Sequence, residues 1–154
     1  MQWIGSQRLE EYLGLKVNGR PHFPDLGFVY IINCADQWYI GQKRCYSLRT
    51  LPALKGQKKK RKVYRGQWET YTGSSRLLNE NIAAGAEYQS TILYVGFSKS
   101  ELNYVETYLQ MITHATHSAD SYNMEVNIKG SRYKMRDNWQ WHLANAIDEL
   151  NLLT

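Results

Sequence analysis

The clearest chemical signal in the sequence is a dense cluster of positive charge between residues 55 and 65. The cluster holds seven basic side chains and no acidic one, whereas the 14 Asp and Glu residues outnumber the Lys and Arg residues in the rest of the chain. Such a cluster binds a polyanion, for example the phosphate backbone of a nucleic acid, or it is a solvated, flexible loop. Its members are Lys55, Lys58, Lys59, Lys60, Arg61, Lys62 and Arg65.

A glutamate on a predicted helix is a second candidate for chemistry. Glu106 lies about 40° from Leu102 and about 60° from Leu109 around that helix, so it flanks an apolar stripe. A carboxylate at the margin of a core is costly unless it is paired or binds a metal ion. A side chain that reaches out to solvent, or a salt bridge, is the alternative. Glu101 lies nearer to the stripe, but helix capping and the helix dipole explain an acid in the first turn.

Two tyrosines lie on a predicted β-hairpin. Runs of β-branched and aromatic residues at 28–32 and 38–40 flank a turn-forming segment, 33–36. A loop centred between residues 34 and 35 places Tyr30 directly opposite Tyr39 on one face of the sheet. Aromatic residues on strands usually only pack, and a hydroxyl with a pKa near 10 is a poor base unless a nearby cation lowers that pKa.

These residues must be positioned by a small α+β sandwich, in which a three-stranded antiparallel sheet is flanked by helices. The capping sequence 98–101 and the apolar stripe behind it predict the helix that carries Glu106. The basic cluster is predicted to be a loop. Helices are expected over 6–13, 44–54, 74–84, 98–112 and 137–150, a loop over 14–25, and a buried strand over 91–95; the stripe is Leu102, Val105, Leu109 and Ile112.

Length and composition limit the class of protein. A chain of 154 residues with 43% hydrophobic and 21% charged residues is typical of one globular domain. No apolar run approaches the roughly 20 residues of a membrane span, and residues 1–8 do not resemble a secretory signal, so we expect a cytoplasmic protein. Cys34 and Cys45 are expected to be free thiols. His114 and His117 lack further ligand-type neighbours, so a zinc site is not predicted.

Several elements, in order, resemble the GIY-YIG nuclease family and in particular its phage-encoded, Seg-like homing endonucleases. Residues 27–33 and 39–44 resemble the paired signature of the family, although Phe28-Val29-Tyr30 replaces Gly-Ile-Tyr. Trp68, the segment 71–75 (YTGSS), the segment 102–106 (LNYVE) and Tyr122-Asn123 resemble the later elements. The resemblance divides the chain into a leader (1–26), a catalytic domain (27–123) with a basic insertion (55–65), and an extension with a tail helix (124–154) packed on the same domain.

The resemblance implies roles for four of these residues. The family's paired tyrosines, here Tyr30 and Tyr39, line the active site, where a hydroxyl orients or deprotonates the attacking water. Glu106 matches the metal-binding glutamate and would hold one Mg²⁺ or Mn²⁺ ion. Asn123 matches a late asparagine that would buttress the site or the water shell of the metal ion.

The catalytic cation is open to more than one assignment. The family's arginine lies on a helix after the second tyrosine element, and its usual spacing from Gly41 corresponds to Arg49. Arg44 and Lys43 follow Gly41 directly and could equally clamp the scissile phosphate. Position 53 is Ala53 where many members have a histidine, which argues against a histidine base.

Contacts with DNA are expected from the basic insertion and from the YTGSS element. The insertion's side chains would bind phosphates, and Ser74 and Ser75 either donate to phosphate or cap a helix. Tyr64, Trp68 and Tyr71 interleave with Arg65 and either stack on bases or pack. The expected DNA-binding residues are Lys58, Lys59, Lys60, Arg61, Lys62, Arg65, Ser74 and Ser75.

The sequence thus predicts a Mg²⁺-dependent endonuclease that cuts double-stranded DNA, of the free-standing phage homing type, acting in the host cytoplasm. Only 31 residues follow Asn123, so recognition is left to the basic insertion, the leader, a homodimer on DNA, or the late basic residues. The alternative is a catalytically silent nucleic-acid-binding module of the same fold. The late basic residues are Lys129, Arg132, Lys134 and Arg136.

Overall fold

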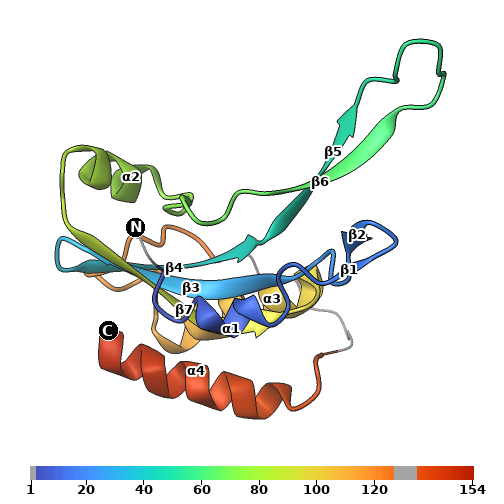
Figure 1. The fold of residues 1–154 in the computed structure, drawn as a ribbon. Coiled ribbons are helices and arrows are strands. Elements are labelled where there is room, and N and C mark those ends of the chain that lie inside the picture. Colours follow the sequence, from blue (N-terminus) through green and yellow to red (C-terminus); the bar gives the residue numbers. More distant parts are fainter. Residues whose placement is uncertain (1–2, 127–134) are drawn as a thin grey trace.

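A computed structural model of the chain describes residues 3–126 and 135–154. The helices and two separate two-stranded sheets are arranged around one central three-stranded sheet (Figure 1). In chain order the elements are α1 (Gln7–Glu10), β1 (Lys16–Val17), β2 (Arg20–Pro21), β3 (Gly27–Cys34), β4 (Gln37–Arg44), β5 (Tyr46–Leu51), β6 (Arg61–Gly66), α2 (Arg76–Ala83), β7 (Tyr88–Gly96), α3 (Lys99–Ile112) and α4 (Trp139–Leu153). No helix within the described ranges is long and apolar enough to cross a membrane.

The central sheet has three antiparallel strands in the order β4-β3-β7. Strand β3 lies in the middle and is buried over almost its whole length, because both of its faces are covered. A continuous apolar sequence is what such a strand requires. The predicted α+β sandwich with a small antiparallel sheet is therefore confirmed.

The register of the β3–β4 hairpin differs from the prediction. Ala35 and Asp36 have φ values of +50° and +61° and form a two-residue turn, in which two positive φ values match the twist of the flanking strands. Tyr30 consequently pairs with Gly41, and Tyr39 pairs with Ile32. The prediction that the tyrosines lie directly opposite each other is wrong. They still share one face, since each is displaced by an even number of residues.

Helices α3 and α4 cover one face of the sheet (Figure 1). Ser98 caps α3 by accepting a hydrogen bond from the Glu101 amide at 3.1 Å. The predicted stripe is buried against β3 and β4 up to Leu109, whereas Ile112 is exposed. Helix α4 adds a second buried stripe to the same face. Its buried residues are Leu143, Ala146 and Leu150.

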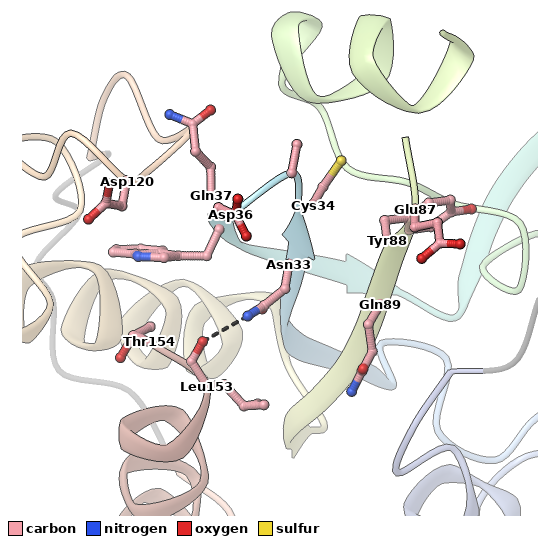
Figure 2. A pocket seen from close by; sticks show the side chains of 12 residues that line it. Asn33, Cys34, Asp36, Gln37, Glu87, Tyr88, Gln89, Asp120, Leu153 and Thr154 are labelled. Carbon is pink, nitrogen blue, oxygen red and sulfur yellow. Dashed lines mark hydrogen bonds between the residues drawn. The ribbon is translucent and has the colours of Figure 1, made fainter. Parts of the chain in front are cut away.

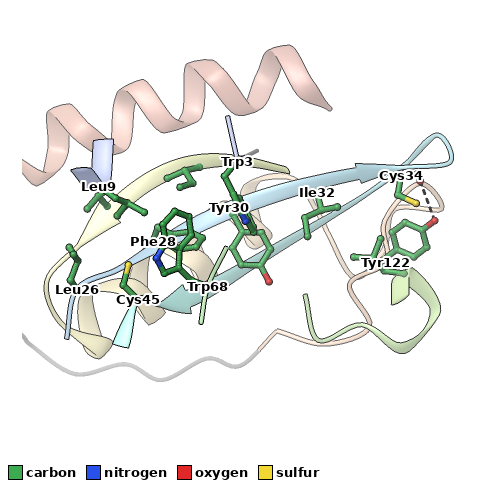
Figure 3. Packing of buried hydrophobic residues seen from close by; sticks show 13 residues of the cluster. Trp3, Leu9, Leu26, Phe28, Tyr30, Ile32, Cys34, Cys45, Trp68 and Tyr122 are labelled. Carbon is green, nitrogen blue, oxygen red and sulfur yellow. Dashed lines mark hydrogen bonds between the residues drawn. The ribbon is translucent and has the colours of Figure 1, made fainter. Parts of the chain in front are cut away.

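The other face of the sheet carries Phe28, Tyr30 and Ile32, and Figure 3 shows how a cluster of large side chains covers them. Trp3 packs edge-on against both Phe28 and Tyr30, with ring centroids 5.2 Å apart in each case. The predicted leader thus supplies a core residue next to a candidate catalytic tyrosine. Leu78 of α2 belongs to the same cluster, and α2 has the predicted place and ends before Gly85, as expected.

The helix predicted over 44–54 is absent. Residues 46–51 form strand β5, which pairs with β6 over six residue pairs, so half of the predicted basic loop is also a strand. The reason is a long-range pairing: the partner strand lies beyond a nine-residue loop, 52–60, and local propensity does not reveal it. Figure 1 shows the β5–β6 hairpin projecting from the end of the central sheet; we call it the arm.

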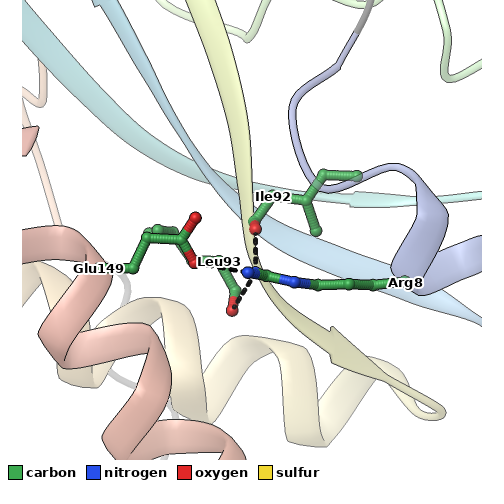
Figure 4. Close-up of polar contacts among 4 residues, drawn as sticks. All are labelled: Arg8, Ile92, Leu93 and Glu149. Atoms are coloured by element: carbon green, nitrogen blue, oxygen red, sulfur yellow. Dashed lines mark hydrogen bonds and ion pairs between the residues drawn. The ribbon is translucent and has the colours of Figure 1, made fainter.

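Side-chain contacts hold both ends of the described chain against the sheet. Arg8 of α1 donates to the Ile92 carbonyl of β7 at 2.6 Å and pairs with Glu149 of α4 at 2.9 Å (Figure 4). Asn33 of β3 donates to the Leu153 carbonyl at 2.7 Å, beside a shallow hollow at the β3–β4 turn (Figure 2). Helix α1 has a single turn, shorter than the helix predicted over 6–13.

The two cysteines, Cys34 and Cys45, are buried and free, as predicted. Cys34 ends strand β3, and Cys45 separates β4 from β5. Burial raises the pKa of the Cys45 thiol to about 12, so this thiol stays protonated at neutral pH and is an unreactive core residue.

Candidate active site

A cavity of about 540 Å³ lies at the outer edge of β4, between the start of α2 and the side of α3. Side chains from four parts of the chain line it: β4, the residues before α2, helix α3, and the segment 121–125. Five predicted site residues meet there, although 84 positions separate the first from the last. They are Tyr39, Ser74, Ser75, Glu106 and Asn123.

The two tyrosines approach each other across Gly41. A Cβ atom on Gly41 would lie 2.5 Å from Tyr30 Oη and 2.8 Å from Tyr39 Cε1, which is closer than van der Waals contact permits. The ring centroids of Tyr30 and Tyr39 are 6.2 Å apart. A glycine two residues after Tyr39 is therefore required for the hydroxyl of Tyr30 to lie over β4.

Burial keeps both tyrosine hydroxyls protonated at neutral pH. Tyr30 is fully buried, and burial, followed by the neighbouring Tyr39 and Tyr71, raises its pKa well above the usual value. Burial also raises the pKa of Tyr39, against the opposing effect of Ser74, whose Oγ lies 2.8 Å from Tyr39 Oη. Tyr39, which lines the cavity, can orient a water molecule as a hydrogen-bond partner, whereas Tyr30 does not line it. Neither hydroxyl is a base without a nearby cation.

Glu106 is half-buried and has no cationic partner within residues 3–126 and 135–154. Gln42 Nε2 donates to Glu106 Oε2 at 2.7 Å and also to Asn103 Oδ1. Burial raises the pKa of the carboxyl, and the hydrogen bond from Gln42 opposes the rise. The salt-bridge alternative is not realised in the described structure. Gln42 was not predicted, although it is the residue that follows Gly41.

Asn123 takes the place of a neighbouring strand along the open edge of β4. Its Oδ1 accepts from the Ile40 amide at 2.9 Å, and its Nδ2 donates to the Ile40 carbonyl at 2.8 Å. Gln110 Nε2 donates to the same carbonyl at 3.0 Å. Both polar groups of the Asn123 side chain are thus used by the backbone of β4. Gln110 was also missed; its position one helical turn after Glu106 is the signal that points to it.

The segment before α2 packs on Tyr39. Gly73 has a φ of +89°, and a Cβ there would lie 3.2 Å from Tyr39 Cε1. Ser74 bonds Tyr39, whereas Ser75 caps α2 and accepts from the Leu78 amide at 3.4 Å. Of the two roles considered for Ser75, capping is the one observed. The start of α2 lies at the cavity, and a helix N-terminus favours a bound anion.

The three candidate cations differ in position. Lys43 lies on the same side of β4 as Tyr39, and its Nζ is 4.0 Å from the centre of the Tyr71 ring, which packs edge-on against Tyr30. Arg44 is exposed and pairs with Asp25 at 3.2 Å. Arg49 is exposed on strand β5, not on the predicted helix. None of the three lines the cavity.

The predicted DNA-binding residues fall into two groups. The lysines 58–60 lie in the loop at the tip of the arm, and Arg61, Lys62 and Arg65 lie on β6. Trp68 and Tyr71 pack against Phe28 and Tyr30, so the packing alternative holds for both. Lys129, Arg132 and Lys134 lie outside the described residues. Arg136 donates to the Val95 carbonyl at 2.8 Å and packs on Phe97.

Comparison with known families agrees with the fold. Residues 21–127 match the family described as the GIY-YIG domain of the endonuclease segE. Since the match covers more than half of the chain, the chain belongs to the GIY-YIG endonuclease family, whose members hydrolyse phosphodiester bonds and generally use a divalent metal ion. No curated protein and no solved structure matches the chain significantly.

Proposed function

We propose that this chain cuts double-stranded DNA in a metal-dependent reaction at the cavity beside β4. The observation that supports the proposal is the meeting of Tyr39, Ser74 and Glu106 around that one cavity, with Gly41 leaving room for Tyr30. These are hydroxyl and carboxylate groups, the types that orient water and bind a hard cation. Membership of the GIY-YIG family supplies the reaction type.

The carboxylate of Glu106 fits a site for one Mg²⁺ or Mn²⁺ ion. It forms no ion pair with a cationic side chain in the described structure. The described residues contain no cluster of three His, Cys, Asp or Glu side chains, so Glu106 would bind the ion without such a cluster. Mg²⁺ is commonly held by one or two carboxylates, with waters and substrate phosphates completing its shell. When bound, the ion would neutralise charge on the scissile phosphate and stabilise the leaving oxygen.

The hydroxyl of Tyr39 is proposed to orient the attacking water. Ser74 Oγ fixes that hydroxyl at 2.8 Å, and the Gly73 turn packs on the ring. Tyr30 is fully buried beneath the site, so it is proposed to hold the Tyr39 ring and the β4 backbone in place. The raised pKa values of both phenols favour hydrogen bonding by the neutral groups over proton abstraction.

Lys43 is proposed to supply positive charge for the phosphate. Its Nζ lies over the ring of Tyr71, which packs against Tyr30. Arg44 lies next to Lys43 at the end of β4 and would have to leave Asp25 to join the site. A catalytic role for Arg49 would require the arm to bring it to the cavity. Asn123 and Gln110 are proposed as positioning residues, because their amides hold the backbone of Ile40.

The experiment that tests the function uses supercoiled plasmid and phage genomic DNA with the wild-type protein. We expect nicking or cutting in the presence of Mg²⁺ and none in the presence of EDTA. Salt-dependent binding without cleavage, under both conditions and on both DNAs, would instead support a catalytically silent DNA-binding module, which the basic arm alone would explain.

The biological setting that we propose is a free-standing, phage-encoded homing-type endonuclease acting in the host cytoplasm. The Seg-like order of the later elements and the segE family match support it. One cavity of this kind cuts one strand at a time, so a homodimer on DNA is proposed for double-strand cleavage. Discrete double-stranded fragments, together with a complex holding two protein copies, would support this proposal, whereas nicks made by a monomer would contradict it.

A further inference from the structure

We propose that the arm is a DNA-reading ribbon that inserts one face, which carries Arg49, Arg61 and Arg65, into the major groove. The inference rests on the nuclease function proposed above and names the element that reads the substrate. It assigns Arg49 to recognition instead of to the chemical step.

The pairing of β5 with β6 puts the three arginines on one face. Ser47 pairs with Arg65, Arg49 with Val63, and Leu51 with Arg61. Because side chains alternate between the faces of a strand, these three pairs point to the same side of the ribbon. Each pair contributes one arginine, so the face carries a row of guanidinium groups that alternates between β6 and β5.

The row has a regular spacing along the ribbon. Successive pairs on one face are two residues apart, about 6.8 Å along the strand. Base pairs also repeat regularly along a duplex, about every 3.4 Å of its axis. The major groove admits a two-stranded ribbon, and an arginine can donate two hydrogen bonds to the edge of a guanine there. The face therefore fits a partner with regularly spaced hydrogen-bond acceptors.

Charge and exposure also favour DNA as the partner. All three arginines are exposed, and none of them has a carboxylate within ion-pair distance in the described part of the chain. No Asp or Glu lies between Asp36 and Glu69 in the sequence, so the arm has no acidic side chain of its own. The lysines at its tip add charge that neutralises phosphates beside the groove.

The opposite face of the arm has a different character. It carries one basic residue, Lys62, beside the directly paired Leu48 and Tyr64, with Tyr46 and Thr50 on the same side. Cross-strand pairs of large side chains stabilise a two-stranded ribbon. Gly56, with a φ of +86°, forms the turn at the tip, where the Gln57 amide donates to the Leu54 carbonyl at 2.8 Å. One face thus stiffens the arm while the other is free to bind.

Both ends of the arm lead directly to the proposed active site. At its start, β5 continues from β4 through buried Cys45, whose amide donates to the Leu26 carbonyl at 2.8 Å. At its end, Gly66 leads to Trp68, whose ring packs on Phe28 at 5.5 Å, and then to the YTGSS segment at the cavity. DNA held by the arm would have to extend along the body of the protein to reach the residues proposed to cut it.

The test selects binding sites from a randomised duplex library, with Glu106→Gln present throughout so that bound DNA is not cut. We expect this protein to enrich sequences with guanines at fixed positions relative to one another. Changing Arg49, Arg61 and Arg65 to Lys keeps the charge but removes the paired donors, so enrichment should fall at least 10-fold at those guanines. The dependence of affinity on salt should remain the same.

Lys62→Ala is the matched control, since Lys62 lies on the opposite face of β6. It should lower the salt slope by about one unit and leave the selected sequence unchanged. An unchanged consensus in the triple Lys variant, or no consensus with any protein, would overturn the inference. Arg49→Lys that binds normally but cuts at least 100-fold more slowly, with Glu106 intact, would also overturn it and make Arg49 catalytic. Failure of the nuclease proposal alone would appear as a normal consensus without cleavage by the wild-type protein.

Discussion

Gly41 lies between two tyrosine rings, and at the scale of single residues this contact explains why the signature of the chain includes a glycine. A side chain at position 41 would overlap Tyr30 Oη and Tyr39 Cε1. The neighbouring Gln42 points to the other face of β4 and bonds Glu106. Two successive residues of β4 thus have separate roles: Gly41 leaves room for the tyrosines, and Gln42 holds the Glu106 carboxylate.

Gly41→Ala is expected to disturb both stability and activity. The added Cβ must displace a buried ring, and overpacking of this kind costs about 1–3 kcal/mol. We expect a lower Tm in thermal unfolding and slower DNA cleavage at a temperature where the variant is folded. Gly66→Ala is the comparison for a milder contact, because its Cβ would meet the Cys45 carbonyl oxygen at 3.3 Å, so its Tm should fall less. Equal Tm values for Gly41→Ala and the wild type would contradict the steric account.

Glu106→Gln is expected to stabilise the fold at alkaline pH. Burial raises the pKa of Glu106 above the usual 4.5 of a glutamate, so the folded protein binds the proton more tightly than the unfolded chain does. The contribution of this carboxyl to wild-type stability is therefore present below pH 4.5 and is lost as the pH rises through the folded-state pKa. Glutamine has no such loss, and it can still accept the hydrogen bond from Gln42.

Thermal unfolding of the wild type and the variant at pH 4 and pH 8 measures this difference. The Tm of Glu106→Gln should exceed that of the wild type at pH 8, and the excess should shrink at pH 4. Glu10→Gln, at an exposed position of α1, is the control for replacing a carboxylate. A variant that is less stable than the wild type at pH 8 would show that the buried carboxylate stabilises the fold.

At the scale of elements, β4 is the strand on which the site depends, because its outer edge is completed at Trp38 by the backbone of residues 120–122 and at Ile40 by side chains. The Ile40 amide and carbonyl bond to Asn123, and the carbonyl also accepts from Gln110. An unpaired backbone group at this buried position would be costly. Asn123 therefore supports the edge at Ile40, next to Tyr39, while the Trp38 backbone is held by the Asp120 carbonyl and the Tyr122 amide.

Asn123→Ala should loosen that edge. Loss of the amide leaves the Ile40 N–H without its partner, at a cost of about 1–3 kcal/mol. We expect the Ile40 amide to exchange hydrogen at least 10-fold faster, with slower cleavage and unchanged affinity for DNA. Asn145→Ala, at an exposed site on α4, is the control. Unchanged exchange at Ile40 would mean that other contacts hold the strand.

Local sequence patterns predicted the elements whose formation depends on local signals. The cap at Ser98 and the apolar stripe of α3 are examples, and the run 91–95 predicted the core of β7. Two features were predicted wrongly, the first for a long-range reason and the second for a local one. The arm forms only through pairing across the 52–60 loop, and the hairpin register follows from positive φ values at Ala35 and Asp36, residues without a glycine to mark the turn.

The candidate site was predictable to a similar extent. Family resemblance and helical spacing indicated Tyr39, Glu106 and Asn123, and these residues meet at one cavity. Gln42 and Gln110 were missed, since an amide side chain carries no signal until its hydrogen-bond partners are seen. Trp3 was missed because aromatic residues in a leader segment do not reveal what they cover.

At the scale of the whole molecule, the sheet separates two tasks. Helices α3 and α4 and the contacts of Arg8 hold the body together on one side (Figures 1 and 4). The start of α2 and the arm lie toward the other side, where DNA would approach. The chain's net charge of +5 arises from the basic segment, so electrostatic attraction would steer DNA to the arm before it reaches the cavity.

The central claim is that DNA is cut at the cavity beside β4, with Glu106 binding the metal ion, and a comparison of rate with affinity tests it most directly. Single-turnover cleavage and equilibrium binding should be measured on the same DNA for the wild type, Glu106→Gln and the control Glu10→Gln. We predict that Glu106→Gln cuts at least about 100-fold more slowly in Mg²⁺ while its affinity for DNA is retained. Cleavage by Glu106→Gln at the wild-type rate would contradict the claim.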